Sequence, residues 1–244
     1  MIKKNILIYS IFMGVMMSKI IYGAQSFQTD TIPTSEGNLV IHFIGHASLI
    51  FEFKGKMIHI DPFSRMADYG ELPKADLILI THEHGDHLDP GAIEKIKKED
   101  TIIVLTKICA ERLGEGIVMK NGDTRKILGL TIEAVPAYNI INHRENGQPF
   151  HPPGNGNGYV LTFGNRRVYI AGDTENIPEM KALKSIDVAF LPMNLPYTMS
   201  PAMTAAAAKS FKPAILYPYH YGKTNTNELL DLLKNEKDIE VRIR

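Results

Sequence analysis

Three histidines and three acidic residues are crowded into one short segment of this 244-residue chain, ILITHEHGDHLDP at 78–90, although the whole chain has only nine histidines. His82, His84, Asp86 and His87 form an H-x-H-x-D-H pattern directly after an apolar run. Imidazole and carboxylate groups together suit divalent transition metals, and the lack of thiolates argues against a structural zinc finger. The segment therefore predicts a metal site on a loop that follows a strand.

Two later candidate ligands also stand at the end of an apolar run. Asp173 follows the run in VYIAGDT, and His220 ends the run in AILYPYH. Alone, Asp173 could cap a turn and His220 could be a packed core histidine. Together with the first cluster they provide three sets of candidate ligands at strand ends. A two-cation site is therefore predicted, and the Asp173 carboxylate could bridge its two ions.

The elements that must position these residues follow from the apolar patterns. Short β-type runs cover 39–45, 48–53 and 56–62, and a continuous run at 75–81 is typical of a strand buried on both faces. Strands then alternate with helices to the end of the chain. This order predicts one α+β domain over 38–244, with two sheets covered by helices on the outside. Residues 25–37 are expected to be an irregular lead-in, and 140–157 a long polar loop with a functional role.

The N-terminus has the layout of a secretory signal peptide. Lys3 and Lys4 precede an apolar run over 6–17, and small residues follow through Ala24. We expect a signal peptide over 1–24, and a mature protein that is periplasmic or secreted. A lysine interrupts the apolar stretch, which is shorter than the ~20 residues that a membrane span needs. No stable span is expected in the mature chain, and anchoring by an uncleaved signal is the alternative.

Composition narrows the possible partners. The 27 basic and 27 acidic residues balance, and no basic stripe indicates a nucleic-acid partner. A small-molecule substrate is expected instead, whereas no feature indicates an oligomeric state. The single cysteine, Cys109, cannot form an internal disulfide and is expected to be a buried thiol in a helix.

With these residues taken together, the sequence resembles the metallo-β-lactamase superfamily. More narrowly, it resembles that superfamily's branch of small metal-dependent hydrolases similar to lactonase-like bacterial proteins. Across residues 38–244 the matching motifs, in order, are GHAS (45–48), IDPF (60–63), THEHGDH (81–87), GDT (172–174), LPMNLPYTMSP (191–201) and YPYHYG (217–222). The resemblance implies an αββα four-layer sandwich of two mixed β-sheets, with helices on both outer faces and the site at the sheet edges.

The resemblance also implies a role for each ligand of two divalent ions. Zinc is the favoured metal, and manganese, iron or nickel would also suit the ligands. His82 and His84 would bind the first ion, Asp173 would bridge, and the second ion would be bound by Asp86, His87 and His220.

The chain departs from the family at one ligand of the first ion. The family's third histidine normally follows the strand that corresponds to TIEAVPA, and this place holds Tyr138 and Asn139. His151 is the preferred substitute, because the prolines and glycines after it would fix a tight loop. Asn139 or water in that place is the alternative, whereas His143 resembles a solvated loop residue.

Several other residues could contact the substrate or hold the ligands. The resemblance places His46 near the metals. Asp61, at a strand end, could hold a ligand imidazole. Tyr138, Asn194, Tyr197 and Tyr221 are possible donors to an oxyanion or leaving group, although packing would explain each one individually.

These features predict a metal-dependent hydrolase of the dinuclear form, whose metal-bridged hydroxide attacks a small ester, lactone, amide or phosphoester. Asp86 would orient the hydroxide as the catalytic residue. The alternatives are an exported β-lactamase and a metal-binding scaffold protein without turnover, the latter suggested by the missing histidine. A di-iron redox role would need a flavin domain, for which the chain has no room.

Overall fold

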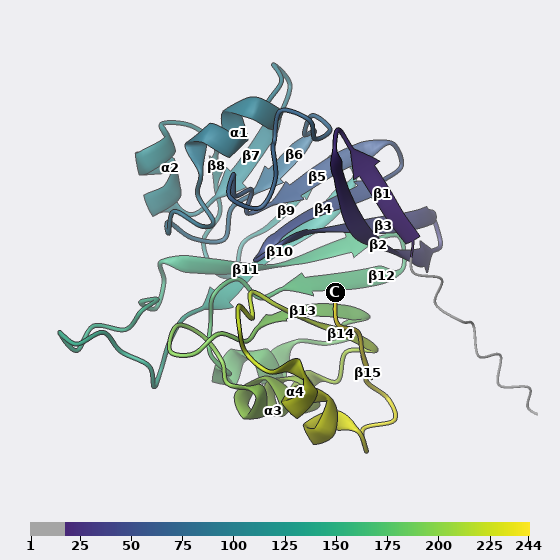
Figure 1. Ribbon diagram of the computed structural model, residues 1–244. Coiled ribbons are helices and arrows are strands. Elements are labelled where there is room, and N and C mark those ends of the chain that lie inside the picture. The colour runs from purple at the N-terminus through teal and green to yellow at the C-terminus, as the bar shows by residue number, and fades with distance from the viewer. Residues whose placement is uncertain (1–17) are drawn as a thin grey trace, which may run out of the picture.

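The computed structural model describes residues 18–244, so most of the predicted signal peptide lies outside the described residues. The strands form two mixed β-sheets that pack face to face (Figure 1). The strands of the first sheet lie in sequence order: β1 (Ser18–Tyr22), β2 (Gln25–Thr34), β3 (Gly37–Gly45), β4 (Ser48–Phe53), β5 (Lys56–Ile60), β6 (Leu77–Leu79), β7 (Ile102–Leu105) and β8 (Ile117–Val118).

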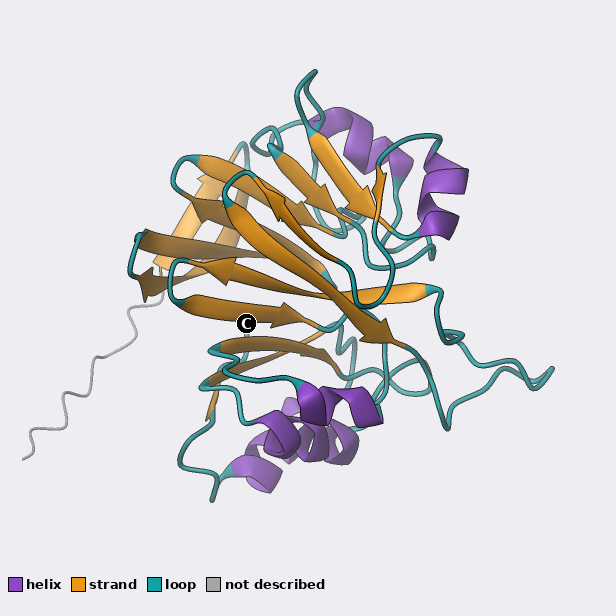
Figure 2. Ribbon diagram, turned by 180° about the vertical axis from the view of Figure 1, so that it is seen from behind, coloured by secondary structure: helices purple, strands orange, loops and turns teal. Residues whose placement is uncertain are grey.

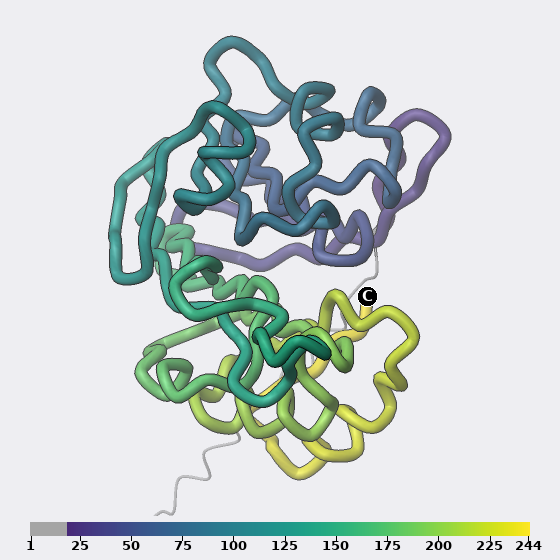
Figure 3. Tube along the Cα trace, turned by 90° about the vertical axis from the view of Figure 1, so that its left-hand side faces the viewer, coloured from purple at the N-terminus to yellow at the C-terminus, as the bar shows by residue number. Residues whose placement is uncertain are grey.

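The second sheet is formed by the later part of the chain, which makes a separate layer of the fold (Figure 3). From one edge to the other, its strands are β15 (Glu240–Val241), β14 (Ile215–Tyr219), β13 (Val188–Pro192), β12 (Arg166–Ile170), β11 (Gly156–Phe163), β10 (Leu130–Ala137) and β9 (Thr124–Ile127). Strands β12 to β15 are parallel, whereas β9 to β12 pair antiparallel.

Helices cover the outer face of each sheet (Figures 1 and 2). Helices α1 (Pro90–Ile96) and α2 (Lys107–Leu113) pack on the first sheet, and α3 (Pro201–Phe211) and α4 (Thr226–Leu233) pack on the second. A short 3₁₀ helix, Pro178–Ala182, lies beside α3. The predicted αββα sandwich is confirmed. Among residues 18–244, no helix combines the length and apolar character needed to cross a membrane.

The sandwich has three apolar layers. The central layer lies between the sheets and includes Phe51 of the first sheet and Phe190 of the second, whose ring centroids are 5.8 Å apart. The two outer layers lie between each sheet and its helices, and Cys109 of α2 is buried in one of them. Burial also raises the pKa of the Cys109 thiol to about 11. The prediction of a buried thiol is therefore confirmed.

The prediction of an irregular lead-in over 25–37 is wrong, because residues 25–34 form strand β2. The sheet begins at Ser18 rather than at residue 38, since β1 pairs antiparallel with β2. The apolar pattern of β2 is weak because some of its buried positions are polar. Asp30, the main example, is only 1% exposed and is paired with Arg242 and Arg244 near the other end of the chain.

The parallel strands position the candidate site. Strands β5, β6 and β7 are parallel in the first sheet, as are β12, β13 and β14 in the second. Side chains that follow β6, β12 and β14 contact one another, so these strand ends meet at one edge of the sandwich. The segment between β10 and β11 reaches the same edge of the sandwich and extends away from the body of the molecule (Figure 2). This segment contains most of the long loop predicted over 140–157.

Candidate metal centre

Three histidines converge at the edge of the sandwich in a first group. His84 Nδ1 lies 3.2 Å from His82 Nε2 and 3.2 Å from His151 Nε2. His82 and His84 come from the segment after β6, whereas His151 comes from the loop between β10 and β11. His143 of the same loop is exposed and lies outside the group, its Nδ1 bonded to the carbonyl of Ile141. The structure thus brings together the three histidines preferred for the first ion.

Asn139 holds His151 in place through its side-chain oxygen. Its side-chain oxygen accepts hydrogen bonds from His151 Nδ1 at 2.6 Å and from the His151 backbone at 2.9 Å. Its amide nitrogen donates to Glu175 and to the Tyr197 carbonyl. Asn139, which occupies the place of the family's histidine, therefore turns the nitrogen Nε2 of His151 toward His84.

Replacing Asn139 with alanine is expected to weaken the affinity for one cation about 10- to 100-fold, because the residue that orients a ligand imidazole is lost. Zinc titration against a chromophoric chelator would measure this change. Asn142→Ala is the matched control, since its amide bonds the Thr198 carbonyl in the same region without touching His151. Equal affinities in the two variants would contradict the role of Asn139.

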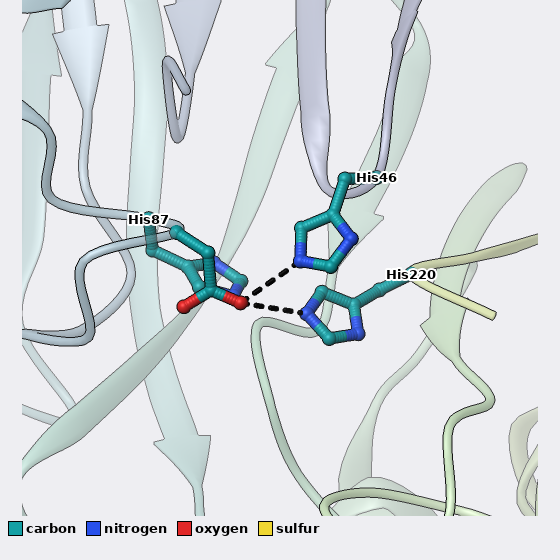
Figure 4. A group of neighbouring side chains, drawn as sticks. His46, His87 and His220 are labelled. Carbon is teal, nitrogen blue, oxygen red and sulfur yellow. Dashed lines mark hydrogen bonds and ion pairs between the residues drawn. The ribbon is translucent and has the colours of Figure 1, made fainter. Parts of the chain in front are cut away.

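A second group lies beside the first and contains one carboxylate and three histidines (Figure 4). Asp86 Oδ2 lies 2.8 Å from His46 Nε2, 3.4 Å from His220 Nε2 and 3.8 Å from His87 Nε2. His46 lies on the turn between β3 and β4, and its φ of 55° is in the left-handed region. His46 is therefore close enough to be an additional ligand, as well as a partner of Asp86.

Asp61 and Thr81 fix the orientation of two candidate ligand histidines, His87 and His82. The Asp61 carboxylate accepts hydrogen bonds from His87 Nδ1 at 2.8 Å and from the Thr81 hydroxyl at 2.6 Å. The Thr81 oxygen accepts in turn from His82 Nδ1 at 3.0 Å. Both rings therefore direct Nε2 into the cluster, which is the arrangement expected around a bound metal. Asp61 has the predicted position, whereas sequence reasoning missed Thr81.

Asp173 lies between the two groups. One of its oxygens, Oδ2, is 3.3 Å from His151 Nε2 and 3.7 Å from His220 Nε2, and the other is 3.6 Å from His87 Nε2. Burial alone would raise the pKa of Asp173, but His220 and His87 hold it well below its usual range. The carboxylate is thus ionised and in contact with both groups, as a bridging ligand requires.

The same charges determine the protonation of the histidines. Burial would lower the pKa of His87, but Asp173 and Asp61 raise it well above its usual value. Burial and the neighbouring His87 lower the pKa of His82. Because a ligand imidazole must be deprotonated, metal binding would release a proton from His87 and would weaken as the pH falls.

The donor atoms fit divalent metal ions. Buried polar atoms almost always have a hydrogen-bond partner. Within residues 18–244, His87 Nε2 and Asp173 Oδ1 are buried without one, and both face the cluster. Pairs of imidazole nitrogens 3.2 Å apart are also better explained by a shared cation than by mutual hydrogen bonds.

The cluster forms one wall of a cavity of about 480 Å³. The loop 140–157 and the segment 192–200 supply other parts of its wall, as predicted. The residues that line the cavity are His46, His84, Gly85, Asp86, Arg144, Phe150, His151, Asp173, Asn194, Tyr197 and His220.

Tyr138 and Tyr221, both predicted to contact the substrate, direct their hydroxyl groups away from the cavity. The Tyr138 hydroxyl donates to Glu179, and the Tyr221 hydroxyl donates to the carbonyl of Arg244. Neither residue lines the cavity, and both rings pack against the apolar layer beneath α3 and α4. Packing therefore explains both tyrosines. Sequence reasoning also missed Glu175, whose carboxylate accepts the backbone N–H groups of residues 140–142 and so fixes the base of the loop.

An αββα sandwich with clustered histidines and aspartates at its edge defines a class of metal-binding proteins. The chain matches the model of the beta-lactamase superfamily domain over residues 40–220, and it therefore belongs to that family. The predicted membership of the metallo-β-lactamase superfamily is confirmed.

Individual proteins agree with this assignment. The chain is 34% identical over 194 residues to a UPF0173 metal-dependent hydrolase of Methanopyrus kandleri, an alignment that covers 75% of this chain and 84% of the relative. A crystal structure classed as a metal-dependent hydrolase, from Parabacteroides distasonis, is 54% identical with a TM-score of 0.86, and the match covers 89% of this chain and 98% of that one. The metallo hydrolase Igni18 of Ignicoccus hospitalis is 25% identical with a TM-score of 0.71, covering 84% and 94%. The prediction of a metal-dependent hydrolase agrees with the names of all three proteins.

Proposed function

We propose that this protein is a hydrolase of small molecules that uses two divalent cations, with zinc as the favoured metal. The observation that carries the proposal is the position of Asp173, whose carboxylate contacts histidines of both ligand groups. The first cation would be held by His82, His84 and His151, and the second by Asp86, His87 and His220. The names of the relatives support hydrolysis as the reaction class.

Cations in these positions would lower the pKa of a bound water and polarise the oxygen of a carbonyl or phosphoryl group. The remaining chemistry belongs to side chains in the cavity wall. Asp86 faces the cavity, and His220 and His46 lower its pKa against the effect of burial, so the carboxylate is ionised and would accept a hydrogen bond from an attacking water. Asn194, also in the wall, would donate to the substrate.

The test combines metal analysis with a substrate panel. Elemental analysis of the zinc-reconstituted protein is expected to give about two ions per chain. That protein is expected to hydrolyse at least one member of an ester, lactone, amide and phosphodiester panel. His84→Ala should abolish this activity, whereas His143→Ala should retain it. Full metal loading without turnover of any substrate would favour the scaffold function, and nitrocefin as the preferred substrate would favour a β-lactamase.

We also propose that the protein is exported to the periplasm or secreted. The lysines and the apolar run over 6–17 support this proposal. Cleavage after Ala24 would remove strand β1, so the sheet of the mature protein would begin at β2. N-terminal sequencing of the protein from a cell-envelope fraction would test it, and an intact N-terminus would indicate the anchored alternative.

A further inference from the structure

One cationic side chain lines the cavity outside the two ligand groups. Arg144, from the loop between β10 and β11, lies in the wall beside His84. Within residues 18–244 it forms no ion pair, and the only carboxylates that line the cavity are the predicted ligands Asp86 and Asp173. The guanidinium therefore faces the cavity with its charge unneutralised by any neighbouring acid.

The local structure holds Arg144 in this position. Its backbone N–H donates to the Gln148 carbonyl, and its carbonyl accepts from the Gly147 N–H, which closes a tight turn. The guanidinium carbon lies 5.1 Å from the centroid of the Phe150 ring, within the range of a cation–π contact, and Nη2 donates to the Phe150 carbonyl at 3.3 Å. Although exposed, the side chain is thus directed along the cavity wall.

The contact between Arg144 and His84 has a consequence for ligand binding. Arg144 Nη2 lies 3.3 Å from His84 Nε2, while His84 Nδ1 is the nitrogen that faces the first group. A neutral imidazole that binds a cation through one nitrogen carries its hydrogen on the other. In the metal-loaded protein both atoms would therefore be donors, and an acceptor placed between them would satisfy both.

The charge balance of the cavity favours an anionic acceptor. Asp61, Asp86 and Asp173 carry three negative charges between them, so two divalent cations would leave a surplus of about one positive charge, to which Arg144 adds another. Planar guanidinium donors match the oxygens of carboxylates and phosphates. Phe150 and Tyr197, whose rings meet edge-on at 5.1 Å, supply an apolar wall next to these donors.

We propose that Arg144, together with the His84 Nε2–H group, binds an anionic group of the substrate, a carboxylate or a phosphate, at the mouth of the cavity. This inference rests on the proposed function, because it assigns the substrate class of the same site. The substrate is then a small anion whose scissile bond lies deeper, at the ligand groups, and whose apolar part lies against Phe150 and Tyr197.

The binding test uses phenylphosphonate, an anion that has no ester bond to hydrolyse. Calorimetric titration of the zinc-loaded protein is expected to show about 10-fold weaker binding for Arg144→Ala than for the unsubstituted protein, and partial recovery for Arg144→Lys, which keeps the charge without the fork of donors. Arg125→Ala, an exposed arginine of β9, is the matched control and should bind normally. Thermal unfolding would verify that all variants are folded.

The kinetic test compares a 4-nitrophenyl ester of a carboxylate-bearing aromatic acid with the corresponding ester that carries a neutral carboxamide. Arg144→Ala should raise KM for the anionic ester several-fold, with little effect on kcat or on the neutral ester. No binding to the unsubstituted protein, unchanged binding by Arg144→Ala, or equal losses in Arg144→Ala and Arg125→Ala would each overturn the inference. Absence of all turnover would overturn the proposed function, while the calorimetric result would still decide the role of Arg144.

Discussion

Replacing Asp173 with asparagine is expected to lower kcat/KM by a factor on the order of a thousand or more, the equivalent of roughly 4 kcal/mol of transition-state stabilisation. Asp173 is buried and, among residues 18–244, is the one carboxylate in contact with histidines of both ligand groups. The substitution keeps the shape of the side chain and removes its charge, so both proposed cations would lose a negative ligand. The measurements are bound zinc per chain and steady-state kinetics on the preferred substrate.

Asp231→Asn provides the control, because this aspartate is exposed on α4 and pairs with Lys234 rather than with a candidate ligand. It should retain both zinc and activity. If Asp173→Asn also kept two zinc ions and most of its activity, the bridging role of the carboxylate would be refuted. Loss of one ion only would place Asp173 in a single ligand group.

Replacing Asp30 with alanine is expected to lower the free energy of unfolding by about 3–5 kcal/mol, the usual effect of removing one partner from a buried ion pair. Asp30 accepts hydrogen bonds from Arg244 at 2.7 Å and from Arg242 at 3.3 Å, as well as from the Tyr217 hydroxyl. Without the carboxylate, the largely buried Arg244 guanidinium would lose its acidic partner, and Arg242 would keep only its pair with Glu240. Urea denaturation monitored by circular dichroism would measure the change.

Two further variants make this prediction specific. Asp30→Asn should lie between the alanine variant and the unsubstituted protein, since the amide oxygen still accepts hydrogen bonds. Asp231→Ala removes an exposed carboxylate and should have little effect. If Asp30→Ala and Asp231→Ala had the same free energy of unfolding, the buried cluster of Asp30, Tyr217, Arg242 and Arg244 would not hold the two sheets together.

Most of the fold could be predicted because its strands have strong apolar patterns with clear boundaries. The run containing β6 is buried on both faces, and Gly114 ends α2 in the left-handed conformation that glycine favours. Strand β2 could not be predicted in this way. Its buried Asp30 resembles a loop residue in the sequence, and the two arginines that pair with it are more than 200 residues away.

The ligand residues could be predicted for a related reason. His82, His84 and the other residues of the H-x-H-x-D-H segment are close in sequence, and Asp173 and His220 follow apolar runs that mark strand ends. The residues that orient them have no such signal. Thr81 and Asn139 are ordinary polar residues in the sequence, and only the folded chain shows which imidazole each one holds.

The position of His151 on a loop also has a kinetic consequence. The other imidazoles of the first group belong to the segment directly after β6, whereas His151 depends on Asn139 and on the loop that Glu175 fixes at its base. Loops of this kind open locally without unfolding of the sheets. The residence time of the first cation would therefore follow the opening rate of this loop, and the second cation, whose ligands do not come from that loop, would exchange on a separate and slower timescale.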